Sequence, residues 1–160
     1  FTSVYVCRIF THERWTSHVV HGKWSASDGT AAGCGNHKQY HKNPQLELVL
    51  SEPTDILVQM SQDEVEGAGR SQSGGREYFA ISLAMLKCAQ AKYTKTFQAK
   101  SDTVQETSPY SFDRSVWFEA FAVPAGRYVI IPSTFDPNEE RPFTINIHTS
   151  HKLTPSPAWL

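Results

Sequence analysis

The residues that could do covalent or metal chemistry begin with Cys34, which stands close to His37 and His41 in a glycine-rich segment. A cysteine and a histidine can serve as nucleophile and base, and together they can bind zinc. Residues adjacent in sequence seldom meet in those roles, however, and no helix start is predicted beside Cys34 to activate its thiol. Two histidines four apart share a face only on a helix, which this segment does not predict. We therefore predict no catalytic residue in this chain.

Two compact groups of acidic residues are the candidates for a metal site. The first consists of Asp63, Glu64 and Glu66, and the second of Asp136, Glu139 and Glu140. Calcium takes about six to eight oxygen ligands, usually from several carboxylates placed together, and neither group supplies that many. Solvated loop charges are the simpler interpretation of both groups. We expect no cofactor here, and a calcium site would require two loops to converge at one end of the domain.

The clearest basic segment is a stretch without acidic residues that also carries Tyr93 and Phe97. Its lysines are Lys87, Lys92, Lys95 and Lys100. On neighbouring strands these side chains would share one face and could meet anionic lipid or an acidic protein surface, at about 1 kcal/mol for each lysine near a charged bilayer. The alternative is that they are edge-strand lysines, which discourage aggregation.

The composition is that of an ordinary globular domain. The chain has 160 residues, 39% of them hydrophobic, and a formal net charge of −1, so we expect no nucleic-acid partner. No apolar run is long enough to predict a membrane span. The cysteines are Cys7, Cys34 and Cys88, and their odd number and wide spacing favour a reducing location, cytoplasmic or nuclear. Because the sequence starts at Phe1 without a signal-like segment, we expect a piece of a longer protein.

The stretch from 123 to 147 carries the clearest structural pattern, which predicts two strands and two turns. Residues 128–131 are apolar and mostly β-branched, as in a strand covered on both faces. Pro132 is expected to end the hydrogen-bond ladder of this strand, and Gly126 to take a positive φ in the turn before it. Residues 143–147 alternate between apolar and polar side chains, so one face of the last strand should be buried.

Few other segments have helical periodicity. Further predicted strands are 4–10, 46–50, 56–60, 78–86, 93–99 and 116–123. The segment 15–40 is predicted to be a long loop with short extended pieces, and 102–114 a polar loop. We expect 46–50 and 56–60 to form a hairpin and 78–86 to pair with 93–99, with a short helix over 84–92 as a less favoured alternative. About eight short strands separated by turns predict an all-β fold, an antiparallel β-sandwich.

Two groups of motifs resemble the C2-like domain, domain III, of calpain-type cysteine proteases. The first reads Gly22-Lys23-Trp24, then Gly29-Thr30-Ala31-Ala32-Gly33-Cys34-Gly35-Asn36, then Asn43-Pro44-Gln45. It is similar to the family's G-x-W, T-A-G-G-C-x-N and N-P-Q signatures, with Ala32 in place of a glycine. The second is similar to the family's P-P-G-x-Y-x-I/V-x-P-S-T-F-x-P ending, and its matching residues are Pro124, Gly126, Tyr128, Pro132, Ser133, Thr134, Phe135 and Pro137.

The resemblance covers residues 22–149 and implies a non-catalytic regulatory or interaction domain of an intracellular calpain-like cysteine endopeptidase. It implies that proteolysis takes place in a separate papain-like core, and that this core, a sister C2-like domain, anionic endosomal membrane and endosomal-sorting proteins are partners. The PalB-type branch, calpain seven, is the branch that the chain resembles most, at its distal C-terminal domain. The motif residues expected to hold the scaffold are Gly33, Asn36, Asn43, Pro44, Gly126, Tyr128, Pro132, Ser133, Thr134 and Phe135.

Conventional members of that family resemble one another in a long acidic loop after the N-P-Q strand. Here the equivalent connection is the tight turn Ser51-Glu52-Pro53-Thr54-Asp55, with two acids. The resemblance therefore implies that most of the electrostatic switch attributed to that loop is missing. We divide the chain into an N-terminal strand and linker (1–21), the sandwich (22–150) and a C-terminal tail (151–160).

A second class of protein is also compatible with the sequence. It is a stand-alone ligand-binding sandwich, either lectin-like or calcium- and lipid-binding, with an exposed tryptophan as a stacking platform. The candidates are Trp15, Trp24 and Trp117, of which Trp117 is expected in the core. Burial of Trp24 separates the two classes, because a platform requires this side chain exposed and packing of the motif requires it buried.

Overall fold

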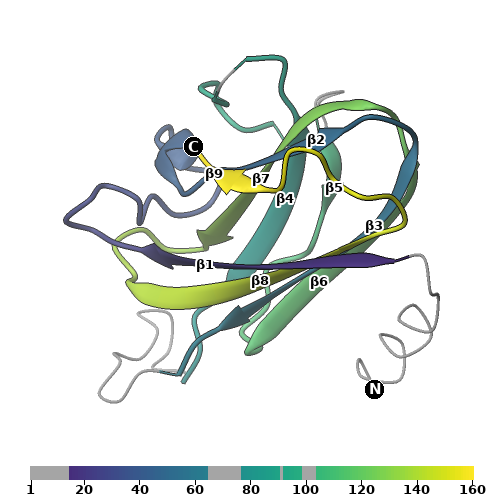
Figure 1. Cartoon of the computed structure of the whole chain (residues 1–160). Helices are drawn as coiled ribbons and strands as arrows, with labels where there is room; N and C mark the ends of the chain where they lie inside the picture. The colour runs from purple at the N-terminus through teal and green to yellow at the C-terminus, as the bar shows by residue number, and fades with distance from the viewer. Residues whose placement is uncertain (1–14, 65–76, 91, 99–103) are drawn as a thin grey trace.

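The computed structural model describes residues 15–64, 77–90, 92–98 and 104–160. Its strands are β1 (Thr16–Trp24), β2 (Leu46–Leu50), β3 (Thr54–Gln62), β4 (Ile81–Lys87), β5 (Val104–Thr107), β6 (Ser115–Val123), β7 (Gly126–Thr134), β8 (Arg141–Thr149) and β9 (Ala158–Trp159), with one 3-10 turn, η1 (Tyr40–Lys42). One antiparallel sheet has the order β1-β8-β3-β6 and the other β5-β4-β7-β2-β9 (Figure 1). The predicted antiparallel β-sandwich is confirmed. The predicted strand 4–10 lies outside the described residues.

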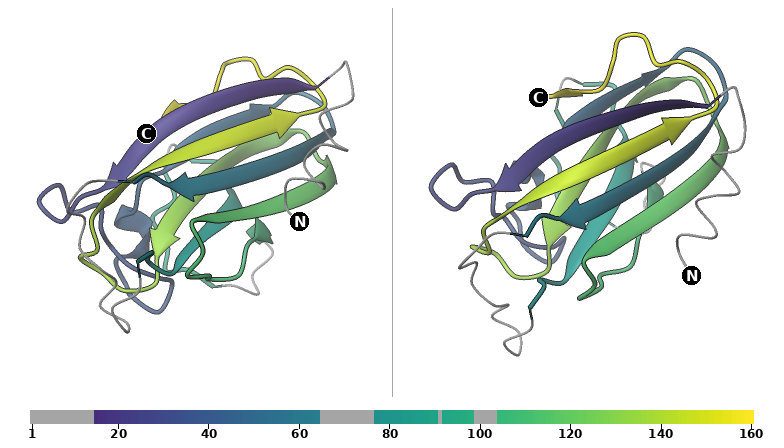
Figure 2. Two further views of the ribbon diagram at one scale, coloured as in Figure 1. Left: turned by 90° about the horizontal axis from the view of Figure 1, so that it is seen from below. Right: turned by 60° about the horizontal axis from the view of Figure 1, so that its bottom comes forward.

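The core between the two sheets follows from the alternation of side chains along the strands. In β8, Phe143, Ile145 and Ile147 are fully buried, whereas the residues between them face outward, as the pattern predicts. Each such side chain contributes about 1.5–3 kcal/mol by burial. Figure 2 shows the two sheets as separate layers.

The apolar run in β7 is buried on both faces, as predicted. Tyr128 and Ile130 face the main core, and Val129 and Ile131 belong to a second cluster on the outer side of the sheet. That cluster includes Tyr40, Leu86, Cys88 and Tyr93, with Phe97 and Val104 packed against it. Two irregular segments, around residue 40 and from 88 to 98, therefore cover the outer face of the five-stranded sheet.

The prediction that Pro132 ends the ladder of β7 is wrong, because β7 continues to Thr134 and pairs there with β4. Strand β2 pairs with β7 only from Gly126 to Ile130, so the β2 side of Pro132 has no strand beside it. The carbonyl of Pro132 instead accepts a hydrogen bond from the Trp24 indole, 3.1 Å away. In an antiparallel ladder the N–H and C=O of one residue point to the same side. A backbone N–H at position 132 would therefore point to a side where no strand lies, so proline costs the ladder no hydrogen bond there.

Two predicted strand pairings are also wrong. Strands β2 and β3 belong to different sheets, so the turn at residues 51–53 carries the chain from one sheet to the other and closes no hairpin. Strand β4 pairs with β5, within the segment predicted as loop, and the described part of 93–99 forms no strand. A short turn between two alternating runs has the same sequence pattern in both arrangements. Tyr93 is buried and Phe97 is partly buried, and both anchor a loop. The alternative helix over 84–92 is contradicted by β4.

Strand β1 was not predicted, because residues 15–40 were expected to form a loop. Its exposed positions carry Ser17, Val19, His21 and Lys23, while the intervening positions are partly buried and include only one large apolar residue, Val20. The strand therefore lacks an apolar stripe. It is held by a nine-residue register with β8, from Thr16 opposite Thr149 to Trp24 opposite Arg141. Strand β1 runs across the predicted domain boundary between residues 21 and 22. The division of the chain into domains stays a prediction.

The β1–β8 pair predicts a pH-dependent stability centred on His148. Burial lowers the pKa of His148, and its Nδ1 lies 2.7 Å from the Ser17 hydroxyl. Native His148 therefore takes up a proton less readily than unfolded His148, so stability is intact above the unfolded pKa of about 6.5 and decreases as pH falls through it. Denaturant unfolding at about pH 8 and about pH 5 should show a smaller pH difference for H148N than for the unaltered chain. The control is H21N, on the same strand pair, and an equal reduction in both variants would contradict the assignment.

Candidate interaction site

The motif segment around residues 31–45 folds around buried side-chain amides. Asn43 is fully buried and its Nδ2 donates to the carbonyls of Gly33 and Tyr40, both at 2.9 Å. Its Oδ1 accepts from the N–H of Ala32 at 3.2 Å. One side chain thus satisfies three backbone groups in a segment that has almost no regular secondary structure.

Gln45, the last residue of N-P-Q, ties this segment to the loop 88–98. Its Nε2 donates to the carbonyl of His41 at 2.7 Å and to that of Tyr93 at 2.8 Å. Its Oε1 accepts from the N–H of Tyr93 at 2.9 Å. The amide therefore pairs with Tyr93 as a strand residue would, and it positions a loop 48 residues further along the chain.

The described residues of the loop 88–98, which are 88–90 and 92–98, present an apolar side to the sheet and a basic side to solvent. Tyr93 is buried, and Phe97 packs on Tyr40 with ring centroids 4.7 Å apart. Lys87, Lys92 and Lys95 are exposed, whereas Lys100 lies outside the described residues. The structure thus places three of the four predicted lysines in and beside one anchored loop.

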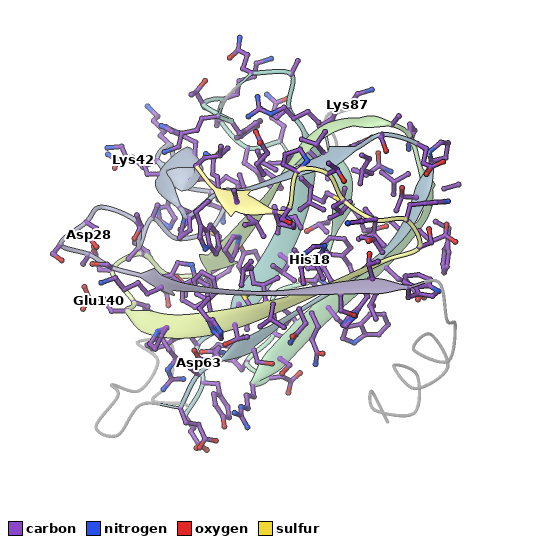
Figure 3. All side chains as sticks on the ribbon, viewed as in Figure 1. His18, Asp28, Lys42, Asp63, Lys87 and Glu140 are labelled. Atoms are coloured by element: carbon purple, nitrogen blue, oxygen red, sulfur yellow. The ribbon has the colours of Figure 1, made fainter. Side chains whose placement is uncertain are left out.

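A further lysine belongs to this surface and was missed from the sequence. Lys42, in η1, is exposed, and its neighbour His41 shares the Gln45 amide with Tyr93. We define the basic surface as Lys42, Lys87, Lys92 and Lys95. Among the described residues none of these four forms a salt bridge. In Figure 3, Lys42 and Lys87 both lie on the upper side of the view. Only the fold could show that η1 and the loop meet.

The second motif holds the turns at the two ends of β7. The Tyr128 hydroxyl donates to the carbonyl of Pro124 at 2.7 Å, and Gly126 has a φ of +154°, as its turn predicts. At the other end, Thr134 Oγ1 donates to the carbonyl of Asp136, and buried Ser133 lies 2.6 Å from the Tyr110 hydroxyl. Burial raises the pKa of Tyr110, so the phenol stays neutral.

Three other motif residues have different environments. Gly33 is buried with a φ of +78°, and a Cβ there would lie 2.9 Å from the His37 ring and from the Pro137 nitrogen, so only glycine fits. Asn36 is exposed and Pro44 is half-buried. Phe135 is 42% exposed and meets Tyr110 edge to face, with ring centroids 5.4 Å apart.

Cys34 is buried, and its backbone is hydrogen-bonded on both sides. Its N–H donates to the carbonyl of Phe135 at 3.1 Å, and its own carbonyl accepts from the N–H of His37 at 3.0 Å. Within the described ranges no hydrogen bond joins the Cys34 sulfur to a histidine. The Cys34–His37 segment is thus held by hydrogen bonds of its backbone.

Two of the acidic residues predicted as metal candidates, Asp63 and Glu64, have protein partners. Asp63 accepts a hydrogen bond from the Thr144 hydroxyl at 2.9 Å, and Glu64 pairs with Arg114 at 3.6 Å. Glu66 lies outside the described residues. Among the residues that the structure describes, no three His, Cys, Asp or Glu side chains gather closely enough to hold a metal ion. The described side chains therefore offer no cluster of the several carboxylates that calcium usually takes, and calcium binding stays untested.

Trp24 is 1% exposed, as packing of the motif requires. The centroid of a Trp24 ring lies 4.5 Å from the centroid of the Phe143 ring. Because the Trp24 side chain is buried in this contact, it cannot serve as a ligand platform. Trp117 is half-buried on the outer face of β6, although a core position was expected, and Trp15 is also half-buried. No helix in the described part of the chain is long and apolar enough to span a membrane.

The chain is an antiparallel sandwich in which the side-chain amides of the N-P-Q motif fasten the irregular loops, among them the segment with the T-A-x-G-C motif. These features define a class of accessory β-domain. The family described as calpain large subunit, domain III, matches residues 20–148, and the chain belongs to this family. It is 28% identical to Calpain-5 of Mus musculus over 161 residues, which cover 93% of this chain and 24% of that protein. It is 30% identical to the calpain-type cysteine protease DEK1 of Arabidopsis thaliana over 169 residues, which cover 96% of this chain and 7% of that protein.

A rice calpain-type cysteine protease, ADL1, is 29% identical and is likewise covered over 7% of its length. The chain therefore spans a quarter or less of the length of these relatives. Among solved structures, a periplasmic lysozyme inhibitor of Aeromonas hydrophila aligns with 83% of this chain and 85% of its own, at a TM-score of 0.45 and 9% identity. A likeness at that level carries no argument about function.

Replacement of Gln45 by alanine tests its role in positioning the loop. The variant leaves the N–H and C=O of Tyr93 without partners, so the free energy of unfolding should fall by about 2–6 kcal/mol, at about 1–3 kcal/mol for each buried unsatisfied group. Hydrogen exchange at the Tyr93 amide should accelerate more than at amides of β8. The matched control, Q39A, removes an exposed glutamine and should change stability by no more than about 0.5 kcal/mol. Equal effects of the two variants would contradict this role.

Proposed function

We propose that this chain is a non-catalytic interaction domain of a calpain-type cysteine protease, and that its basic surface binds anionic membrane. Membership of the domain III family supports the first part, because the relatives it matches are calpains and calpain-type cysteine proteases. The buried Cys34, whose sulfur has no histidine partner among the described residues, agrees with catalysis by a separate part of the protein.

The observation that carries the second part is the arrangement of the loop 88–98. Its apolar side is fastened to the sheet by Tyr93 and by the Gln45 amide, so its lysines are held on a fixed support. The described carboxylates form no salt bridges with these lysines, so their charge is available to a partner. Phosphate groups of lipids would each meet an ammonium group at about 1 kcal/mol per lysine, and salt would weaken the attraction.

The same proposal places the chain beside its own papain-like core and a sister C2-like domain, in the cytoplasm or nucleus, with endosomal membranes as the anionic surface. Of the branches of the family, it assigns the chain to the PalB type. Because the turn between β2 and β3, residues 51–53, is short, the basic surface would act without the long acidic loop of conventional members.

The triple variant Lys87→Glu, Lys92→Glu, Lys95→Glu tests the basic surface. Co-sedimentation with phosphatidylcholine vesicles that contain phosphatidylserine should show binding of the unaltered chain at low salt and a loss of about 100-fold in the variant, as expected for three lysines at about 1 kcal/mol each. Vesicles of phosphatidylcholine alone should not bind the chain.

The matched control is the triple variant Lys23→Glu, Arg114→Glu, Lys152→Glu, which makes the same change in net charge at exposed positions outside the basic surface. It should retain most of the binding. If both triple variants lose binding equally, the attraction is one of net charge, and the assignment to the basic surface is wrong. If the unaltered chain does not distinguish the two kinds of vesicle, the membrane proposal fails.

A separate experiment tests the absence of catalysis. Labelled casein incubated with this chain, with or without calcium, should release no more peptide than a blank. The variant C34S should behave identically. Peptidase activity that C34S abolishes would contradict the proposal and assign the cysteine a catalytic role.

A further inference from the structure

The C-terminal residues bridge the two sheets on one open side of the sandwich. Strand β9 pairs with β2, placing Trp159 opposite Leu46 and Ala158 opposite Glu47. The Trp159 indole donates 2.9 Å to the carbonyl of His21 in β1, which belongs to the other sheet. Figure 1 shows β9 beside β2 at the C-terminus. We name this place the edge slot, bounded by His21, Gly22, Leu46, Glu47 and Phe143.

The edge slot is shaped for an aromatic side chain. A Cβ at Gly22 would lie 2.7 Å from the Phe143 ring and 2.9 Å from the Trp159 ring, so both rings fit only because residue 22 has no side chain. The Trp159 and Phe143 rings meet edge to face, with centroids 5.9 Å apart. Phe143 is fully buried, so the floor of the slot is part of the rigid core. Glycine weakens a strand interior, and room for the incoming ring explains its presence here.

The present occupant is held by few contacts. Trp159 and Leu160 are 37% and 39% exposed, and the nearest buried residue before them is Leu153. The ladder between β9 and β2 covers only two of the five β2 residues, extended by one bond from the N–H of Leu160 to the carbonyl of Gln45 at 3.0 Å. A segment with so little burial can leave without opening the core.

The free edge of β2 has further backbone groups with which an added strand could pair beyond those that residues 158–160 use. Hydrogen-bonded positions alternate along an antiparallel edge, so the phase set by Gln45 and Glu47 continues at Val49. The chain turns away before it reaches Val49, and none of the described strands pairs with β2 on this side beyond Glu47. An extended segment that continued straight along β2 would form that further pair.

We propose that the edge slot is a peptide-binding site for an extended segment of a partner protein that carries a tryptophan or similar aromatic side chain. Residues 158–160 are its built-in competitor. The partner adds a strand to the β2 edge, places its ring on Phe143 above Gly22, and gains the pairing at Val49 that the tail lacks. The evidence for this site does not involve the lysines of the basic surface, so the proposal does not depend on the proposed membrane contact.

The variant W159A of the 160-residue chain tests the proposal, because it removes the competing ring and leaves the slot. The probes are fluorescein-labelled TPSPAWL, which repeats residues 154–160, and TPSPAAL. Fluorescence anisotropy should show W159A binding TPSPAWL at least about 10-fold more tightly than TPSPAAL. The unaltered chain should bind TPSPAWL at least about 10-fold more weakly than W159A, since its own tail competes at a local concentration of order millimolar.

A second substitution locates the binding. Gly22→Val in the W159A chain fills the slot and should abolish binding of TPSPAWL, whereas Val19→Thr, at an exposed position of the same strand, should leave it unchanged. If the Gly22→Val chain fails to fold, Gly22→Ala should still weaken binding by at least about 10-fold, because its Cβ meets the same rings.

Two outcomes would overturn the proposal. One is a folded W159A chain, judged by its unfolding midpoint, that binds neither peptide or binds both equally. The other is a concentration-dependent dimer of the unaltered chain, seen by light scattering and lost in W159A, because it would assign the edge slot to the tail of a second copy.

Discussion

Buried side-chain amides are the constraint on which the irregular half of this structure depends. A primary amide in an apolar interior must satisfy both its donors and its acceptor, and an unsatisfied group costs about 1–3 kcal/mol. Asn43 and Gln45 meet this requirement with backbone groups of Gly33, Tyr40 and Tyr93, which have no strand partner of their own. Each amide thus does for a loop what a neighbouring strand does for a β-residue, and it fixes the loop in one position.

The same device recurs with Gln62 at the end of β3. Its Nε2 donates to the carbonyls of Phe79 and Asp113, and its Oε1 accepts from the N–H of Phe79 and from Arg141. The guanidinium of Arg141 is itself buried over the Phe79 ring, 5.0 Å from its centroid. A charge so placed is tolerated because an amide oxygen, a carbonyl and aromatic faces replace water. Buried side-chain amides therefore anchor loops at two places in the sandwich.

The sequence predicted those parts of the fold whose side chains alternate strongly. Strand β8 and the doubly covered β7 follow from their own residues, and the N-P-Q motif, together with the other signatures, indicated the family. Strand β1 was missed because its inward positions include His18 and Gly22, and pairing with β8 compensates for the absent apolar stripe. The assignment of β2 and β3 to different sheets depends on which distant strand each one meets, and no local pattern encodes that choice.

For the candidate sites the limit was sequence separation. The lysines of 87–95 could be recognised because they lie close together in the chain, whereas Lys42 joins them only through the Gln45 amide. The edge slot was not predicted, because Trp159 and His21 are 138 positions apart. Gly22 was noted only as part of a motif. Its reason, the space for two rings, depends on Phe143 and on Trp159.

Gln45 connects the basic surface with the edge slot. Its side chain fastens the loop of the basic surface, and its backbone carbonyl accepts the hydrogen bond from Leu160 in the edge slot. The two proposed binding regions thus meet at a single residue, Gln45, whose main chain belongs to one and whose side chain belongs to the other. Thermodynamic linkage makes any coupling between them reciprocal: the factor by which an occupied slot changes lipid affinity equals the factor by which bound lipid changes peptide affinity.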